Sequence, residues 1–271
     1  MILPDLYWPK EGQPVITAYT VMTLTGVLVT LFYMMRFARK NGYDEYRVLF
    51  IELIAFAGAF IGGHLLGCIV AMDRVAEFFR KIGSFSSAME FRNAFVQAFS
   101  TNVFFGGLIL ALILTALYIR KNEKVRWPYF DMTAVGIPLF HGFGRLGCFF
   151  SGCCFGETCS WGIGYAHPLS TAPAGVPLLP VQLIEAILNF LLFFLLRRLF
   201  VKKLGRGRLL LVYLIVYSSY RFVLEFFRGD KVRGFVGTLS TSQFIALLLI
   251  AFASVCWIVL AKKKPSAPSE A

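Results

Sequence analysis

Charged residues are scarce in this chain. Only 15% of its 271 residues are Asp, Glu, Lys or Arg, whereas 58% are hydrophobic. A soluble domain of this size carries far more charge, so the composition excludes an ordinary water-soluble fold. The sequence also lacks an internal repeat, and its first residues lack the basic region of a cleavable signal peptide. The first apolar segment is therefore expected to stay attached to the protein.

Acidic residues are scarcer than basic ones, 15 against 27, and the formal net charge is +12. In a soluble protein this imbalance would indicate nucleic-acid binding. Here the basic residues cluster in short segments between apolar runs. Anionic lipid headgroups of a bilayer are the expected partners, and nucleic acid is not.

Long apolar runs are abundant. Each run has about 20 residues, which is enough to cross roughly 30 Å of hydrocarbon. We predict an all-α polytopic membrane protein with seven transmembrane helices in a single domain, residues 1–264, followed by a disordered tail, residues 265–271. The fourth helix is expected to be kinked, because Gly136, Pro138, Gly142 and Gly144 interrupt it. The predicted spans are 15–35, 48–72, 94–118, 128–147, 181–200, 209–228 and 239–261.

The basic residues also predict the orientation. If the N-terminus is outside, the segments placed inside hold more than twice as many Lys and Arg as those outside. Cytoplasmic loops carry such an excess, so the N-terminus is predicted to be outside and the C-terminus cytoplasmic. The segment 148–180 then faces the exterior. Short interfacial helices or strands are expected there and in 73–93, where Phe78, Phe79, Ile82 and Phe85 could share one face.

Ionisable residues interrupt the end of the fourth run, in the stretch His141–Gly156. A charge at membrane depth costs several kcal/mol and is usually kept for function. Irregular backbone at that depth requires protein or a water-filled cavity beside it. We place the active site in this stretch, with Arg145 as its central residue. His141 precedes Arg145 by one helical turn and could face the same cavity, and His64 follows Gly62 and Gly63 in the second span. Each could instead be a packed, hydrogen-bonded histidine, and His167 in the exterior segment indicates little.

A second buried charge lies in the sixth span. Arg221, Glu225 and Arg228 are spaced i, i+4 and i+7, which places them on one helix face. One interpretation is a structural ion pair. The other is an anion-binding site, in which Arg145 and Arg221 together hold a lipid phosphate, because guanidinium matches phosphate oxygens bidentately.

Polar residues also open the fifth span. Gln182 and Glu185 follow Pro180 and lie one turn apart. An acid near a helix N-terminus complements the helix dipole, so a capping role is one interpretation and a functional role is the other.

Cysteines form a Cys-x4-Cys-Cys-x4-Cys pattern at Cys148, Cys153, Cys154 and Cys159. Zinc sites prefer Cys-x2-Cys pairs, so the spacing argues against a metal, and no metal or cofactor is predicted. A disulfide is favoured in an exterior segment, with buried thiols as the alternative.

These blocks together resemble the prolipoprotein diacylglyceryl transferase family, in a cysteine-rich form. The signature Gly-Arg-x-Gly-Asn followed by a polar residue and a glycine is similar to the stretch from Gly144 to Gly156. Further blocks resemble Pro-x-Gln-Leu-x-Glu and Tyr-Arg-Phe-x-x-Glu-Phe-x-Arg. The matching residues are Tyr19, Gly106, Gly107, Gly144, Arg145, Gly147, Cys148, Gly156, Gln182, Glu185, Arg221, Glu225 and Arg228.

The resemblance implies an activity. Family members transfer the diacylglyceryl group of phosphatidylglycerol to the lipobox cysteine of a prolipoprotein in the bacterial cytoplasmic (inner) membrane. A thioether forms and glycerol phosphate leaves. The expected catalytic residues are Arg145, Arg221 and His141, and the other matching residues are expected to bind substrate.

Three departures accompany the resemblance. Phe105 stands where the family has a histidine before the paired glycines, Cys148 replaces the signature asparagine, and Cys153 replaces a glutamate. Either the role of base has moved, with His141 as the nearest candidate, or the reaction has changed. The alternatives are a lipid-binding paralogue that is non-catalytic or has altered specificity, and a redox or metal-handling membrane protein.

Overall fold

The structure is a computed structural model, and it describes residues 5–6, 16–122, 126–165, 170–230 and 235–262. The chain divides into two compact units. The first unit comprises Met1–Asn41 and Phe130–Ala271, and the second comprises Gly42–Tyr129. Helices make up nearly all of both units, which confirms the predicted all-α class.

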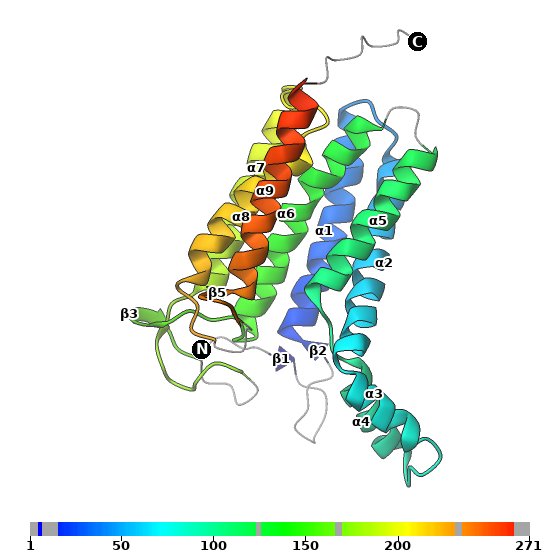
Figure 1. The fold of residues 1–271 in the computed structure, drawn as a ribbon, viewed down its shortest axis with the longest axis vertical. Helices are drawn as coiled ribbons and strands as arrows, with labels where there is room; N and C mark the ends of the chain where they lie inside the picture. The colour runs from blue at the N-terminus through cyan, green and yellow to red at the C-terminus, as the bar shows by residue number, and fades with distance from the viewer. Residues whose placement is uncertain (1–4, 7–15, 123–125, 166–169, 231–234, 263–271) are drawn as a thin grey trace. The chain divides into compact units, whose positions relative to one another are not determined.

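The first unit is a bundle of long helices with short strands at one end (Figure 1). Strands β1 and β2 pair antiparallel with Asp5 opposite Thr17, and β4 and β5 pair with Phe235 opposite Ser240. The helices are α1 (Ala18–Lys40), α6 (Trp127–Phe150), α7 (Val181–Val201), α8 (Leu209–Glu225) and α9 (Thr241–Lys262). The strands are β1 (Asp5–Leu6), β2 (Ile16–Thr17), β3 (Thr158–Ile163), β4 (Phe235–Val236) and β5 (Leu239–Ser240).

Local hydrogen bonds fix where these helices begin. Ser240 and Gln243 form a capping box at the start of α9, in which Gln243 N donates to Ser240 Oγ at 3.2 Å and Ser240 N donates to Gln243 Oε1 at 3.0 Å. The carboxylate of Asp131 on α6 accepts from the backbone N–H groups of Gly207 and Leu209, at 2.6 and 3.1 Å. The start of α8 is therefore held against the first turns of α6.

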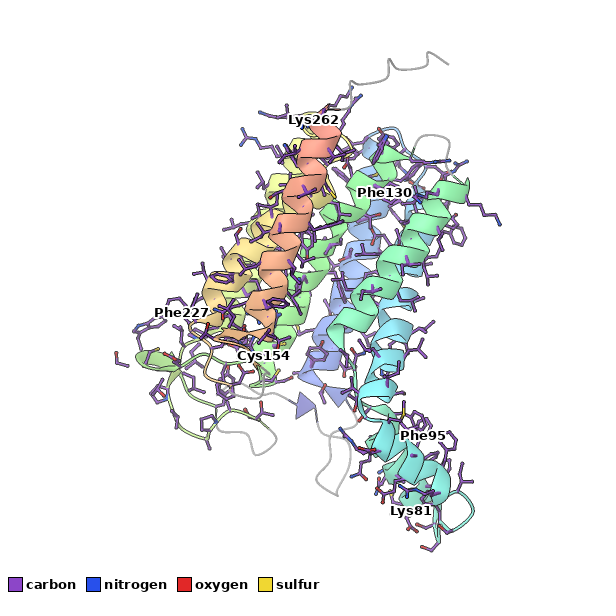
Figure 2. The ribbon with its side chains drawn as sticks, viewed as in Figure 1. Lys81, Phe95, Phe130, Cys154, Phe227 and Lys262 are labelled. Carbon is purple, nitrogen blue, oxygen red and sulfur yellow. The ribbon has the colours of Figure 1, made fainter. Side chains whose placement is uncertain are left out.

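The helix ends bring distant segments together. In Figures 1 and 2, the C-terminal ends of α6 and α8 lie at the end of this unit that carries β3 and β5, near the labelled Cys154 and Phe227. Lys262, at the end of α9, lies at the opposite end (Figure 2). The described parts of the two connections therefore converge at one end of the bundle; they are residues 151–165, 170–180, 226–230 and 235–240.

The second unit is built on a close helix pair. Its helices are α2 (Glu45–Val70), α3 (Met72–Arg80), α4 (Ala88–Phe99) and α5 (Phe104–Asn122). A Cβ atom added at Gly107 would lie 2.5 Å from the carbonyl oxygen of Ala59, and one at Gly106 would lie 2.5 Å from Leu66 Cβ. Small residues allow such close backbone approach between apolar helices. The pair predicted to bind substrate, Gly106 and Gly107, thus lies in the contact between α2 and α5, and its substrate role stays a prediction.

Helices α3 and α4 carry an aromatic cluster centred on Phe78, which is buried. Phe79 and Ile82 are exposed, at 58% and 53%, so only part of the predicted aromatic face faces inward. The rings around Phe78 are those of Phe79, Phe85, Phe91, Phe95 and Phe99.

Three described helices have the length and apolarity to cross a membrane: Ala18–Lys40, Glu45–Val70 and Thr241–Lys262. One prediction about the other segments was wrong. The third segment is not one helix from residue 94, because the chain breaks at 100–103 and Val103 N donates to Gly63 O at 3.0 Å. The fourth segment is one continuous helix, since α6 runs through Pro138 to Phe150, and the kink stays a prediction.

Candidate active site

A buried carboxylate lies at the centre of the polar cluster. Glu185 stands one turn inside α7, and its side chain is 1% exposed. Its Oε1 atom lies 3.0 Å from Nε of Arg145 on α6 and 4.0 Å from Nε of Arg221 on α8. One carboxylate oxygen therefore brings together the two arginines that the sequence singled out. The sequence analysis gave Glu185 a capping role or a functional role and did not connect it with either arginine.

Arg221 has two further partners. Its Nη2 atom lies 2.5 Å from Glu225 Oε2, one turn along α8, and 3.4 Å from Ser242 Oγ at the start of α9. The predicted i, i+4 pair is confirmed, but its extension to Arg228 was wrong. Helix α8 ends at Glu225, and Arg228 forms a bidentate pair with Asp230 at 2.8 and 2.7 Å.

Several buried polar atoms of this cluster have no hydrogen-bond partner among the described residues. They are Glu185 Oε2, Arg221 Nη1 and Arg228 Nη1. A buried donor or acceptor without a partner costs about 1–3 kcal/mol, more for a charged group. Two guanidinium groups with unused donors in one buried cluster are what a bound anion requires.

Tyrosines connect His141 to the cluster. The Tyr217 hydroxyl donates to Glu185 Oε1 at 3.5 Å, and the imidazole of His141 lies over the Tyr217 ring with 4.9 Å between centroids. The Tyr213 hydroxyl lies 3.5 Å from His141 Nδ1. His141 is thus within the same polar network as Arg145, although it reaches the carboxylate only through Tyr217.

The glycine-rich connection after α6 is held between two other segments. Gly156 N donates to Leu179 O at 2.9 Å, and Gly229 N donates to Phe155 O at 3.1 Å. A Cβ atom at Gly156 would lie 2.6 Å from a Val181 methyl group, so only glycine fits there. This packing places the connection across the start of α7 and the end of α8.

Gln182 ties the same connection to α7. Its Nε2 atom donates to the backbone oxygen of Cys153 at 2.6 Å and to the Tyr165 hydroxyl at 3.5 Å. Burial raises the pKa of Tyr165 to about 12, so this phenol stays protonated at neutral pH. The polar role predicted for Gln182 is therefore, in part, to position the loop that carries the cysteines.

All six cysteines lie in the described part of the chain, and none of them forms a disulfide. The predicted disulfide was therefore wrong, and the thiol alternative describes the structure, with Cys148 buried and the others partly buried. The sulfurs of Cys148, Cys153 and Cys154 lie within 4.8 Å of one another. Hydrogen bonds from the Cys148 and Cys153 thiols lower the pKa of Cys154. The cysteine pattern thus produces a sulfur cluster, which Cys159 does not join.

Tyr19 and two glycines of α6 adjoin this region. Gly147 faces α1, where a Cβ atom would meet the Tyr19 ring at 3.1 Å. A Cβ atom at Gly144 would meet nothing within 4 Å. The helix therefore leaves open space beside Arg145 and packs closely one turn later. Of the remaining predicted positions, the Phe105 side chain and His167 lie outside the described residues.

Sequence reasoning missed the tyrosines and Ser242. A signal was available, because Tyr213, Tyr217, Arg221 and Glu225 recur every four residues in an otherwise apolar helix. Such spacing places polar groups on one face, towards the bundle interior. Ser242 gives no comparable signal, since only the fold brings it to Arg221.

Comparison with known proteins identifies the family of the chain. The family model described as prolipoprotein diacylglyceryl transferase matches residues 10–259. The chain belongs to this family. The phosphatidylglycerol–prolipoprotein diacylglyceryl transferase of Clostridium tetani is 33% identical over 239 residues, which cover 87% of this chain and 89% of that protein.

Other relatives carry the same name. The second such transferase of Clostridium perfringens is 32% identical over 240 residues, covering 87% of each chain. The transferase of Campylobacter hominis is 28% identical over 255 residues, covering 90% of this chain and 86% of that protein. The family match over residues 10–259 includes every element that forms the polar cluster.

Proposed function

We propose that this protein transfers the diacylglyceryl group of phosphatidylglycerol to the thiol of a prolipoprotein lipobox cysteine, in the bacterial cytoplasmic membrane. Membership of the prolipoprotein diacylglyceryl transferase family supports the reaction. The observation that carries the assignment to a site is the sharing of Glu185 by Arg145 and Arg221, with guanidinium donors left unused.

The arginines act as a phosphate clamp. A guanidinium has five N–H donors, and the ion pairs with Glu185 and Glu225 occupy only some of them. A phosphate diester placed between Arg145 and Arg221 would receive the remaining donors. The carboxylate of Glu185 then fixes the spacing of the two arginines, because it contacts both. Glu225 holds Arg221 from the other side.

The reaction requires little else from the protein. The acceptor sulfur forms a bond to the glyceryl carbon, and the bond from that carbon to the phosphate oxygen breaks. Glycerol phosphate leaves with the electron pair, and the arginines stabilise the charge that develops on it. The thiol proton must leave, and His141 is the proposed base, because an imidazole can accept a proton and this one belongs to the same polar network.

The remaining predicted residues surround these groups. We assign the open space at Gly144 to the lipid, and the neighbouring Tyr19 and Gly147 to its boundary. Gln182 and Gly156 hold the connection after α6 over the clamp. Arg228, paired with Asp230, supplies a further cation for the leaving phosphate.

The placement in the bilayer is part of the same proposal. Residues 1–264 form one transmembrane domain with seven spans, in which α1, α2, α5, α6, α7, α8 and α9 cross the membrane. The N-terminus is outside and the C-terminus is cytoplasmic. Basic residues in the last turns of α1, α5, α7 and α9 support this orientation. The site then opens towards the exterior, where secreted prolipoproteins arrive.

Transfer in a defined system tests the function. Purified protein in vesicles containing phosphatidylglycerol should convert a lipobox peptide to its diacylglyceryl thioether, detected by mass spectrometry. The same peptide with serine in place of its cysteine is the matched control, as are vesicles of phosphatidylcholine alone. Binding of phosphatidylglycerol without any thioether product would contradict the proposal and identify a non-catalytic paralogue.

A further inference from the structure

Three sulfur atoms meet beside the proposed phosphate clamp. Those of Cys148, Cys153 and Cys154 lie within 4.8 Å of one another, and none of the three cysteines is in a disulfide. Cys148 is buried at the end of α6, and the other two are partly buried in the turn that follows. The proposed reaction does not use these thiols as a group, so their convergence needs its own explanation.

The backbone is shaped to bring the sulfurs together. Gly152 and Cys154 both adopt positive φ angles, 63° and 60°. A non-glycine residue rarely adopts such a conformation, and residues that do so cluster at functional sites. Cys153 N donates to Cys148 O at 3.1 Å, which folds the turn back over the helix end. The helix end therefore brings the sulfurs of the Cys-x4-Cys-Cys sequence close together, as a loop does for a Cys-x2-Cys pair.

The dimensions suit a soft divalent cation. A tetrahedral zinc site with bonds of about 2.3 Å has sulfurs about 3.8 Å apart, so rotation of the side chains would close the cluster onto an ion. Three thiolates select zinc-like ions over magnesium or calcium. Among the described residues, no fourth histidine, cysteine or carboxylate joins the group. Structural zinc sites have four protein ligands, whereas catalytic sites have three and an open position.

The cluster is also close to the groups that would act with it. Arg145 precedes Cys148 by three residues on α6, which places both on one face of the helix. The backbone of Cys153 accepts a hydrogen bond from Gln182, one turn before Glu185 on α7. The same helices therefore carry the sulfurs and the clamp.

We propose that Cys148, Cys153 and Cys154 bind Zn²⁺ through three thiolates, and that the acceptor cysteine of the prolipoprotein occupies the fourth position. This inference rests on the proposed function. The acceptor thiol binds the ion as a thiolate, and its proton passes through water to His141. The bound sulfur then forms the thioether bond to the glyceryl carbon, the carbon–oxygen bond breaks, and glycerol phosphate leaves towards the arginines with the electron pair.

Thiolate formation on a metal ion would compensate for the histidine base that this sequence lacks at position 105. The resemblance described under Sequence analysis leads one to expect a histidine, an asparagine and a glutamate at the positions of Phe105, Cys148 and Cys153. A coordinated thiol is deprotonated outright, so the ion would supply a thiolate at neutral pH without a strong base. The three departures, Phe105, Cys148 and Cys153, are then explained together, because a metal ion replaces the histidine base as the means of forming the thiolate.

Metal analysis of the purified full-length protein gives the first test. Wild-type protein purified from cells grown with zinc should contain about one zinc ion per chain. The variants Cys148→Ser, Cys153→Ser and Cys154→Ser should each lose most of it. Cys159→Ser and Cys256→Ser are matched controls that should keep the metal. Wild-type protein without bound zinc, or with a disulfide among the three cysteines under reducing purification, would overturn the proposal.

A cobalt-substituted wild-type protein gives the second test and needs no variant to fold. Addition of a lipobox peptide should strengthen the thiolate-to-cobalt charge-transfer absorption, because a fourth thiolate joins the ion. The serine peptide should leave the spectrum unchanged. An identical spectrum with both peptides would overturn acceptor binding and leave only a structural ion.

The experiments distinguish failure of the zinc site from failure of the proposed transferase function. A protein that transfers lipid but binds no zinc refutes the metal site and leaves the transferase function intact. A protein whose cobalt spectrum responds to the peptide, but which forms no thioether, refutes the transfer reaction instead. His141→Ala should keep the metal but weaken the spectral response and the activity together, because the acceptor thiol loses its proton acceptor, whereas Cys154→Ser should lose the metal as well.

Discussion

At the scale of single residues, the shared carboxylate predicts that lysine cannot replace either arginine. Arg221 contacts Glu185, Glu225 and Ser242 from different edges of one guanidinium. A lysine ammonium is a point charge and cannot make contacts in so many fixed directions. A phosphate bound at Arg145 and Arg221 depends on the same geometry.

We expect Arg145→Ala and Arg221→Lys each to lower kcat/KM for transfer by a factor of about 10 to 100 or more, since a hydrogen bond to a charged group contributes about 1.5–3 kcal/mol. The measurement is the rate of peptide lipidation in detergent, with folding checked by thermal unfolding. Arg47→Ala is the control, because that side chain is half exposed and pairs with Asp44, three residues before it on the chain. A folded Arg145→Ala protein with wild-type kcat/KM would contradict the clamp.

His141 offers a second prediction at this scale. His141→Ala should reduce transfer by about 10²–10⁴-fold and remove one limb of the pH profile, as is typical when a general base is lost. His64→Ala and His167→Ala should keep both the rate and the profile. His64 lies on α2, where its Nδ1 atom is 2.9 Å from Phe60 O and 3.3 Å from Asn102 Nδ2. An unchanged pH profile in His141→Ala would exclude it as the base.

The important charged residues were predictable one at a time, but their partners were not. Arg145, Arg221 and Glu185 are recognisable because a charge in an apolar run is costly. Which carboxylate joins which arginine depends on how α6, α7 and α8 pack, and no local pattern encodes that. The cysteines show the same limit, because their cluster depends on a turn with two positive φ angles.

At the scale of elements, α6 distinguishes glycines needed for packing from those that leave space. A Cβ atom at Gly142 would lie 2.6 Å from the Phe190 ring, whereas one at Gly144 would meet nothing within 4 Å. Both positions are helical, so alanine suits the backbone at each.

Gly142→Ala should therefore lower the free energy of unfolding by about 1–3 kcal/mol, because the added methyl group overpacks the helix contact. The Gly144→Ala protein should unfold at the wild-type temperature or slightly above it. If the space at Gly144 belongs to the lipid, Gly144→Ala should nevertheless raise KM for phosphatidylglycerol. Thermal unfolding and lipid-dependent kinetics separate the two effects. A Gly144→Ala protein with unchanged stability and unchanged KM would show that the lipid does not use this space.

Element boundaries were least predictable where tertiary hydrogen bonds compete with the helix. Residues 94–118 are apolar enough to suggest one span, but the chain leaves the helix at Ser100 and Val103 bonds to Gly63 on α2. The end of α8 is similar. Phe227 O accepts from Glu157 N at 2.9 Å, so the helix stops before Arg228 and the predicted three-residue face is cut short.

At the scale of the whole molecule, the distribution of basic residues predicts which side of the membrane the site faces. Arg39 and Lys40 lie in the last turn of α1, Arg198 in that of α7 and Lys262 in that of α9. Within the first unit these helix ends are opposite to the end that carries Cys154 (Figure 2). The positive-inside rule then places the sulfurs and Arg228 on the exterior side.

Reporter fusions test this orientation. Alkaline phosphatase, which is active only outside the cytoplasm, should be active when fused after Ser84, between α3 and α4, and inactive when fused after Lys203, between α7 and α8. A green fluorescent protein fused at the same two positions should give the reverse result and so controls for expression. The physical reason is that the segment around Lys203 belongs to a basic loop, and basic loops resist translocation. Activity at Lys203 and none at Ser84 would reverse the topology. The sulfur cluster would then face the cytoplasm, where an acceptor that is recognised after export could not reach it.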